Sequence, residues 1–189
     1  YRETGSGVPF IFQHGLGGDE AQVGAHFPEA GFRRLTLECR AQGRSEAGEP
    51  SHFSIETFAG DVLAFADARG VDRFAVGGIS MGAAIALNIA VNHPNRVSAL
   101  IFARPAWAFE KAPENMRPLA EVASYLPQGD KEAFEKSDLG RRLAIEAPDN
   151  LASMLGFFDR PDPVTTARLL SAIAADGPGV SRKQAAAIR

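Results

Sequence analysis

The sequence predicts an α/β protein with a mainly parallel sheet, flanking helices and a separate helical segment. Two observations support this prediction. Short apolar runs in the first 105 residues alternate with segments of helix length, which is typical of βαβ units. Residues 113–189 contain no convincing strand and indicate four or five short helices. We therefore expect an α/β core over residues 1–105 and a helical segment over residues 106–189.

Four strong strands are expected, after a strand tail at residues 1–4. The run Val8–Gln13 (VPFIFQ) is short, apolar and rich in aromatic residues, as in a strand buried on both faces. Phe32–Glu38 alternates in character, and Arg73–Ile79 and Val97–Ala103 are again apolar. Because helix-length segments separate the last three, the strands are expected to run parallel.

Two helices are expected between these strands. The apolar residues of Ser54–Arg69 keep the spacing of three and four that places them on one helical face. Ser54 is a suitable N-cap, and Gly70 ends the helix. Met81–Asn92 is a helix of small and apolar residues that ends at His93 and Pro94. In the last part of the chain, helix breaks are expected near Pro127, Pro148, residues 161–163 and residues 177–179.

Composition excludes several classes of protein. The 189 residues carry a formal net charge of −3, which gives no electrostatic reason to expect nucleic acid or anionic lipid as a partner. No apolar stretch approaches the ~20 residues that span a bilayer. The one cysteine, Cys39, excludes an intrachain disulfide and favours a reducing compartment, so a cytoplasmic location is expected. No zinc-ligand spacing is present, and no metal or organic cofactor is expected.

The sequence Gly78-Ile79-Ser80-Met81-Gly82 fits the pattern G-x-S-x-G and lies between an expected strand and an expected helix. That context is the one in which a nucleophilic serine occupies a sharp turn. The glycines two before and two after the serine leave room for strand and helix to approach. The alternative is an ordinary glycine-rich turn with a capping serine. We favour Ser80 as a nucleophile.

A glycine-rich loop, His14-Gly15-Leu16-Gly17-Gly18, follows the first buried strand. Acyl transfer to a serine requires donors aimed at the oxyanion of the tetrahedral intermediate. The expected pair of donors is the backbone amides of Met81 and Leu16. Alternatively, the glycines only form a sharp turn. We expect His14 to be a structural histidine near the site, with Gly15 part of the same scaffold, and not a base.

A third stretch, Glu38-Cys39-Arg40-Ala41-Gln42-Gly43-Arg44-Ser45, follows the second expected buried strand. An acid and an arginine can brace such a loop by charge-assisted hydrogen bonds. We therefore interpret Arg40 as part of the scaffold of the site. Cys39 is expected to be a small buried apolar side chain and not a reactive thiol.

Together these three motifs resemble the alpha/beta-hydrolase fold family, in its branch of lid-bearing esterases and lactonases. HGLGG is similar to the oxyanion loop of that branch, ECRAQGRSE to its acid-x-Arg-Gly-x-Gly-x-Ser stretch and GISMGAA to its nucleophile turn. The match covers about residues 5–105. Glu38 stands where Asp is usual, and Ala41 where Gly is usual, which predicts an ordinary backbone conformation at Ala41.

The resemblance also has implications for the second part of the chain. Residues 106–189 occupy the place of the family's helical lid, inserted after the strand that ends near Ala103. Such a lid implies an apolar substrate pocket. Its candidate lining residues are Trp107, Phe109, Met154, Phe157 and Phe158, although ordinary lid packing is expected for more than half of them.

The family's order of catalytic groups is serine, acid and histidine, but all four histidines lie in the first half of this chain. His93 is separated from Ser80 by a helix of twelve residues, or ~18 Å. His26 and His52 precede the turn, and no carboxylate directly follows Ala103. Either the acid and histidine lie outside these 189 residues, which we favour, or the fold has become a non-catalytic ligand-binding protein.

We therefore expect a serine hydrolase that acts on a small carboxylic ester, thioester or lactone through an acyl-enzyme on Ser80. Hydrolysis of carbon–carbon bonds and acyl transfer with the same serine are alternatives. The expected partner is a small-molecule substrate, with no nucleic acid and no membrane, and the sequence leaves the oligomeric state open. Little turnover is expected from these 189 residues alone, because the base is missing.

Overall fold

The structure is a computed structural model that describes residues 1–27, 31–107 and 109–188. The chain forms two compact units. The first unit comprises Tyr1–Lys111 and Asp176–Arg189, and the second unit comprises Ala112–Ala175. Our prediction divided the chain once, between residues 105 and 106. In the structure the first unit extends further, and the end of the chain returns to it.

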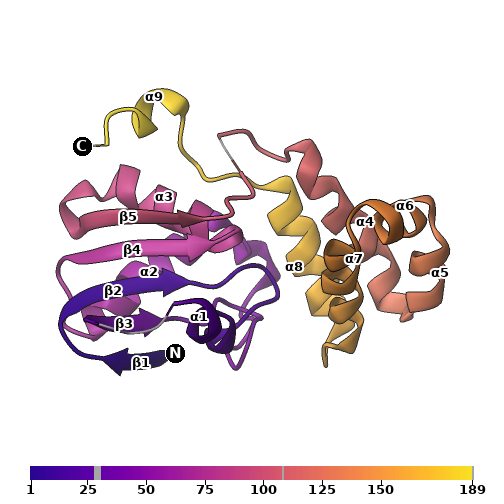
Figure 1. The fold of residues 1–189 in the computed structure, drawn as a ribbon, viewed down its shortest axis with the longest axis horizontal. Helices are drawn as coiled ribbons and strands as arrows, with labels where there is room; N and C mark the ends of the chain where they lie inside the picture. Colours follow the sequence, from indigo (N-terminus) through magenta and orange to yellow (C-terminus); the bar gives the residue numbers. More distant parts are fainter. Residues whose placement is uncertain (28–30, 108, 189) are drawn as a thin grey trace. The chain divides into compact units, whose positions relative to one another are not determined.

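The first unit contains a five-stranded sheet (Figure 1). Its strands are β1 (Arg2–Gly5), β2 (Val8–Gln13), β3 (Phe32–Thr36), β4 (Phe74–Ile79) and β5 (Val97–Ala103). The order is β1-β3-β2-β4-β5; β1 runs antiparallel to β3, and the other neighbours are parallel. This arrangement confirms the mainly parallel sheet that the sequence predicts.

Most residues of strands β2 and β4 are buried, because each of these strands has a neighbouring strand on both sides. Ile11 and Phe12 of β2 and Val76 of β4 are completely buried. The edge strand β5 differs, since the side chains of Ile101 and Phe102 are 38% and 47% exposed although both are apolar.

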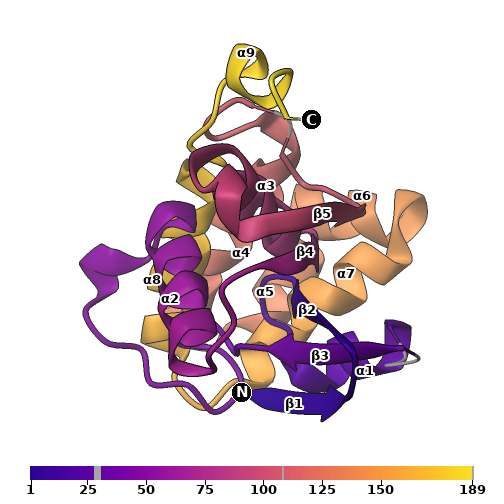
Figure 2. The same ribbon diagram turned by 90° about the vertical axis from the view of Figure 1, so that its left-hand side faces the viewer.

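Helices cover both faces of this sheet, and Figure 2 shows α1 and α2 on opposite sides. These helices are α1 (Glu20–His26), α2 (Ile55–Ala68) and α3 (Met81–Asn92). Val23 of α1 packs with Phe10, Phe12 and Ala75 of the sheet. Helix α3 packs on β4 and β5 and against α2. Ser54 caps α2, as its sequence predicts, because its Oγ accepts the Thr57 N–H at 3.1 Å.

Helix α1 is not among the helices predicted from the sequence. Asp19 begins this helix, since its carboxylate accepts the N–H groups of Ala21 and Gln22 at 2.9 and 3.2 Å. The helix has seven residues and buries only Val23, so it lacks the apolar periodicity of a longer helix. The capping aspartate followed by Glu20 was the signal that could have identified it.

The second unit is helical, and its described residues contain no strand, as predicted. It contains α4 (Arg117–Tyr125), α5 (Lys131–Lys136), α6 (Asp138–Glu146), α7 (Pro148–Leu155) and α8 (Pro163–Ala175). Its fully buried residues include Val122, Leu126, Phe134, Leu170 and Ile173. Helices are interrupted at Pro148 and at residues 161–163, as predicted. Pro148 and Pro163 are the first residues of the helices that follow, a position where proline's missing N–H costs nothing.

Short 3-10 turns complete the structure. They cover Pro50–His52, Pro94–Arg96, Glu114–Met116, Leu126–Gln128 and Gly156–Asp159. Within the described part of the chain, no helix combines the length and apolar character needed to cross a membrane.

Residues from Asp176 onward join the first unit through partly or fully buried polar contacts. The Asp176 carboxylate accepts the Ile55 N–H at the start of α2, at 2.7 Å. The Trp107 indole donates to the Asp176 carbonyl at 3.0 Å, and the Asn88 amide donates to the Pro178 carbonyl at 2.9 Å. These contacts, which sequence patterns do not reveal, explain why the segment containing α9 (Arg182–Ala185) belongs with the sheet.

Candidate active site

Ser80 lies at the turn between β4 and α3 and is half-buried. Its backbone has φ 53° and ψ −108°, outside the regions that residues with a side chain prefer. The Ser80 N–H donates to the Ala103 carbonyl at the end of β5, at 3.0 Å. A strained residue of this kind persists only where its surroundings hold it, and such residues cluster at functional sites.

Two glycines make this turn possible. A Cβ atom on Gly78 would lie 2.1 Å from the Gly82 carbonyl carbon, and one on Gly82 would lie 2.3 Å from the Gln13 carbonyl oxygen. Real Cβ atoms do not approach other atoms so closely. The G-x-S-x-G spacing is therefore required by close approach of β4, α3 and β2.

The glycine-rich loop 14–18 reaches the serine. A Cβ atom on Gly15 would lie 3.6 Å from Ser80 Cβ and 3.5 Å from the Ile79 carbonyl oxygen. These are ordinary van der Waals distances, so Gly15 and Ser80 are direct neighbours. The structure thus brings together two motifs that are far apart in the sequence.

Most backbone amides of the loop already have acceptors. Gly15 N–H donates to Gln22 Oε1 at 2.8 Å, Gly17 N–H to Gln42 Oε1 at 2.7 Å and Gly18 N–H to the Gly15 carbonyl at 2.9 Å. Within the described residues, the Leu16 and Met81 amides donate no hydrogen bond. The Met81 amide also belongs to the first turn of α3, where the helix dipole favours negative charge.

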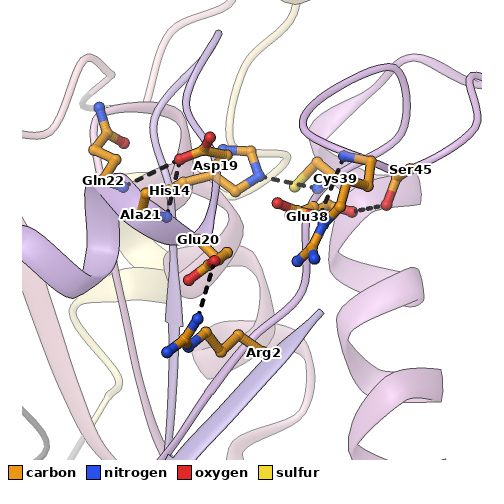
Figure 3. Close-up of polar contacts among 10 residues, drawn as sticks. Arg2, His14, Asp19, Glu20, Ala21, Gln22, Glu38, Cys39 and Ser45 are labelled. Carbon is orange, nitrogen blue, oxygen red and sulfur yellow. Dashed lines mark hydrogen bonds and ion pairs between the residues drawn. The ribbon is translucent and has the colours of Figure 1, made fainter.

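His14 is completely buried, and both of its ring nitrogens are bonded. The Cys39 N–H donates to His14 Nε2 at 2.9 Å (Figure 3), so Nε2 is the unprotonated nitrogen. The proton is then on Nδ1, which donates to the Gly15 carbonyl at 2.8 Å. This geometry suits a structural histidine that joins the loop after β2 to the loop after β3.

The acid and the arginine of the third motif bind different partners. Glu38 is 3% exposed, and its carboxylate accepts from both the backbone and the side chain of Arg44 at 3.2 Å. Arg40 instead forms a two-point ion pair with Asp61 of α2, at 2.6 and 2.7 Å. Ser45 Oγ closes the loop by donating to the Glu38 carbonyl at 2.7 Å (Figure 3).

The surroundings of this loop shift two pKa values. Burial acts to raise the pKa of Glu38, but hydrogen bonds from Arg44, the charge of that arginine and the Glu20 N–H together lower it below its ordinary value. Burial, with a smaller contribution from the charge of Asp61, raises the pKa of the Cys39 thiol far above its ordinary value. Cys39 is therefore a neutral buried side chain.

The expectation of an ordinary backbone at Ala41 is wrong, because Ala41 has φ 58°. The tight loop requires a left-handed residue at this point: Gln42 N–H donates to the Cys39 carbonyl at 3.0 Å, and Ala41 N–H to the Glu46 carbonyl at 3.2 Å. A glycine adopts this conformation freely, whereas alanine is strained in it.

None of the other three histidines, all of which the structure describes, forms a hydrogen bond with Ser80. His26 Nδ1 is bonded to the Gln22 carbonyl in its own helix, His52 is exposed in a 3-10 turn, and His93 caps the far end of α3. In the part of the chain that the structure describes, no hydrogen bond to the Ser80 hydroxyl is recorded. Nor do those residues include a cluster of three or more His, Cys, Asp or Glu side chains placed to hold a metal ion.

The five candidate pocket residues are divided between the two units. Trp107 and Phe109 belong to the first unit, where Trp107 is bonded to Asp176 and the Arg182 guanidinium lies 5.2 Å from the centre of the Phe109 ring. Met154, Phe157 and Phe158 belong to the second unit. Phe158 lies 6.1 Å from the ring of Phe134, between ring centres. A shared pocket stays a prediction.

The fold defines a class of protein, α/β proteins with a mainly parallel sheet, and the candidate site lies at the carboxyl ends of the parallel strands. Residues 8–147 match the family described as the alpha/beta hydrolase fold, and the chain belongs to that family. This membership confirms the resemblance that the three motifs suggested.

Curated relatives of this chain are named as more than one kind of enzyme. The putative carbamate hydrolase RutD of Variovorax paradoxus (strain S110) is 33% identical over 106 residues, which cover 54% of this chain and 39% of that protein. The putative non-heme bromoperoxidase BpoC of Mycobacterium tuberculosis (strain CDC 1551 / Oshkosh) is 32% identical over 105 residues, 53% of this chain and 39% of that protein. The chain therefore spans about two fifths of the length of these curated relatives.

Among solved structures, the enol-lactonase from Burkholderia xenovorans LB400 superposes with a TM-score of 0.63 and 26% identity. The match covers 98% of this chain and 70% of the enol-lactonase chain. Together with the family match, this similarity supports the α/β fold over nearly the whole chain.

Proposed function

We propose that the protein is a serine hydrolase in which Ser80 is the nucleophile. The observation that carries the proposal is the strained backbone of Ser80, held at a strand-to-helix turn next to the glycine-rich loop. A serine with a purely structural role has no need of a backbone at φ 53°, or of glycines at 78 and 82 that make such a backbone possible. The same conformation exposes a serine hydroxyl at the carboxyl end of a sheet.

In the proposed reaction, Ser80 Oγ attacks the carbonyl carbon of the substrate and its proton passes to a base. The carbonyl oxygen becomes an oxyanion, which the Leu16 and Met81 amides stabilise. The alcohol departs with a proton, and an acyl-enzyme remains on Ser80. Water then attacks the acyl group, releases the carboxylic acid and returns the proton to Ser80.

The base and its orienting acid are proposed to come from outside these 189 residues. His14 cannot serve as the base, because both of its ring nitrogens are engaged. The relatives are longer than this chain, which leaves room for additional groups in the complete protein.

The proposed substrate is a small carboxylic ester, thioester or lactone. The names of the relatives support an acyl compound: one is described as a carbamate hydrolase and another as an enol-lactonase. In both named compounds, the reacting group is a carbonyl with an oxygen or nitrogen leaving group.

One observation favours a second candidate, a ligand-binding protein without catalysis. No histidine of the described residues is bonded to Ser80. Under this alternative, Ser80 and the loop amides would hold a carbonyl or carboxylate without reacting with it.

Hydrolysis by the protein from its complete reading frame distinguishes the two candidates. We expect release of carboxylic acid from a panel of short acyl esters and lactones, and loss of at least about a thousandfold in rate in Ser80→Ala. Ser98→Ala, on exposed β5, is the matched control and should retain the rate. Binding of the same compounds without turnover would favour the ligand-binding alternative.

A further inference from the structure

We infer that Gln22 and Gln42 are positioning residues that together fix the direction of the Leu16 amide. This inference rests on the proposed function, because the Leu16 amide is one of the two proposed oxyanion donors. Gln42 lies within the third motif, where the sequence predicted no role for it, and Gln22 lies outside all three motifs.

The two glutamines bind the loop on either side of Leu16. Gln22 comes from α1 and accepts the Gly15 N–H through Oε1 at 2.8 Å. Gln42 comes from the loop after β3 and accepts the Gly17 N–H through Oε1 at 2.7 Å. The amides immediately before and after Leu16 N–H are thus held by side chains from two different elements.

Burial holds the Gln42 acceptor in place, and the Gln22 acceptor lies close to the Gly18 backbone. Gln42 is 1% exposed, and its Nε2 lies 4.0 Å from Met81 Sδ, so the residue also contacts the residue after the serine. A Cβ atom on Gly18 would lie 2.5 Å from Gln22 Oε1. A side chain at position 18 would therefore displace the Gln22 carbonyl from its present place.

The peptide group that contains the Leu16 N–H is held at its other end as well. Its carbonyl is that of Gly15, which accepts both Gly18 N–H at 2.9 Å and His14 Nδ1–H at 2.8 Å. In a trans peptide the C=O and N–H point in opposite directions. With the carbonyl fixed toward His14 and Gly18, the Leu16 N–H must point away from them.

Three consecutive peptide groups are thus fixed, and the middle one carries the proposed donor. An oxyanion donor is effective only when it is held before the reaction begins. Loss of either glutamine would release one flanking peptide and allow the Leu16 amide to rotate. The substrate carbonyl in the ground state gains less from this amide than the oxyanion does, so kcat should fall more than KM rises.

The test compares Gln22→Met and Gln42→Met, which keep side-chain length but lack the carbonyl acceptor. Gln128→Met, at an exposed 3-10 turn of the second unit, is the matched control. Gln22→Glu retains an acceptor for Gly15. The measurements, on the protein from its complete reading frame, are backbone amide hydrogen exchange by NMR and kcat and KM for a short acyl ester.

We expect faster exchange of Gly15 in Gln22→Met and of Gly17 in Gln42→Met. Each variant should lose about tenfold or more in kcat with little change in KM. Gln22→Glu should restore protection of Gly15, and the control should match the unmodified protein. Because Gln22 is only half-buried, its variants remain informative if Gln42→Met does not fold.

Unchanged exchange in both methionine variants, or unchanged kcat despite faster exchange, would overturn the inference. If the unmodified protein lacks ester turnover, the proposed function fails and the positioning role fails with it. Faster exchange in the methionine variants would then still show that the glutamines hold the loop. The two failures are therefore distinguishable.

Discussion

Ser80 adopts a backbone conformation that residues with a side chain avoid, and Gly78 and Gly82 make this conformation possible. At the scale of single residues, the site depends on close approaches of backbone to backbone. Such approaches leave no room for even one methyl group, whereas Gly60 and Gly70 of the same unit have no atom within 4 Å of an added Cβ.

Gly78→Ala is expected to destabilise the first unit by about 3 kcal/mol, because the added Cβ overlaps the Gly82 backbone. The matched control is Gly60→Ala, at an exposed position of α2 where nothing lies within 4 Å of an added Cβ. The control should stabilise the protein by about 1 kcal/mol through helix propensity. Equal changes in the free energy of unfolding, measured in urea, would contradict the proposed crowding.

Ala41→Gly should stabilise the protein, the reverse of the usual trend for alanine and glycine. A left-handed alanine costs about 1–2 kcal/mol, and the greater chain entropy of glycine offsets about 0.5–1 kcal/mol of this. The expected net gain in unfolding free energy is about 0.5–1 kcal/mol. A loss of stability in urea titration would show that Ala41 has an ordinary conformation in solution.

At the scale of elements, segments far apart in the sequence complete each other's hydrogen bonds. Helix α2 begins at Ile55, and its N-terminus is capped by Ser54 and also by Asp176. The first contact is local and was predicted from the sequence. The second joins Asp176, the first residue of the returning segment of the first unit, to the start of α2.

Asp176→Ala is expected to lower the free energy of unfolding of the first unit by about 1 kcal/mol, since Ile55 N–H loses its acceptor at the helix N-terminus. Asp72→Ala, in the exposed turn between α2 and β4, is the control and should have little effect. Thermal unfolding of both variants measures the difference. Indistinguishable midpoints would contradict a capping role for Asp176.

The difference between local and long-range contacts also explains which elements could be predicted from the sequence. Val8–Gln13 and Met81–Asn92 were predicted with the observed bounds, because their continuous apolar character reflects burial on several sides. Helix α1 was not predicted, since it buries a single residue and its start depends on Asp19.

For the site, the motif predicted the turn at Ser80 but not what holds the loop beside it. Gln22 and Gln42 act through carbonyl oxygens across 7 and 25 positions of sequence, and no periodicity reports such contacts. Ala41 likewise shows that one tight loop can impose a left-handed backbone on a residue that does not favour it.

At the scale of the whole molecule, acid should weaken the fold through buried and bridged carboxylates. The pKa of Glu38 lies below its ordinary value, as does that of Glu3, through hydrogen bonds and charge from Arg33 and Arg69 that outweigh its burial. A carboxyl whose pKa is lower in the folded state stabilises the protein above its ordinary pKa. That contribution is lost as the pH falls through the lowered pKa.

Glu38→Gln is therefore expected to be less stable than the unmodified protein at pH 7, and the difference should shrink as the pH falls below about 4.3, the ordinary pKa of a glutamate. Glu49→Gln, at an exposed position, is the control and should follow the unmodified protein more closely. Urea unfolding at several pH values measures these differences. A constant difference from pH 7 to pH 2 would show that Glu38 acts through packing and not through its charge.

The central claim, that Ser80 is the nucleophile, is tested most directly by covalent labelling with a fluorophosphonate. We expect the protein from its complete reading frame to gain the mass of one adduct, with peptide mapping placing it on Ser80. Ser80→Ala should remain unlabelled under the same conditions. Labelling of Ser80→Ala to the same extent, or an adduct mapped to another residue, would contradict the claim.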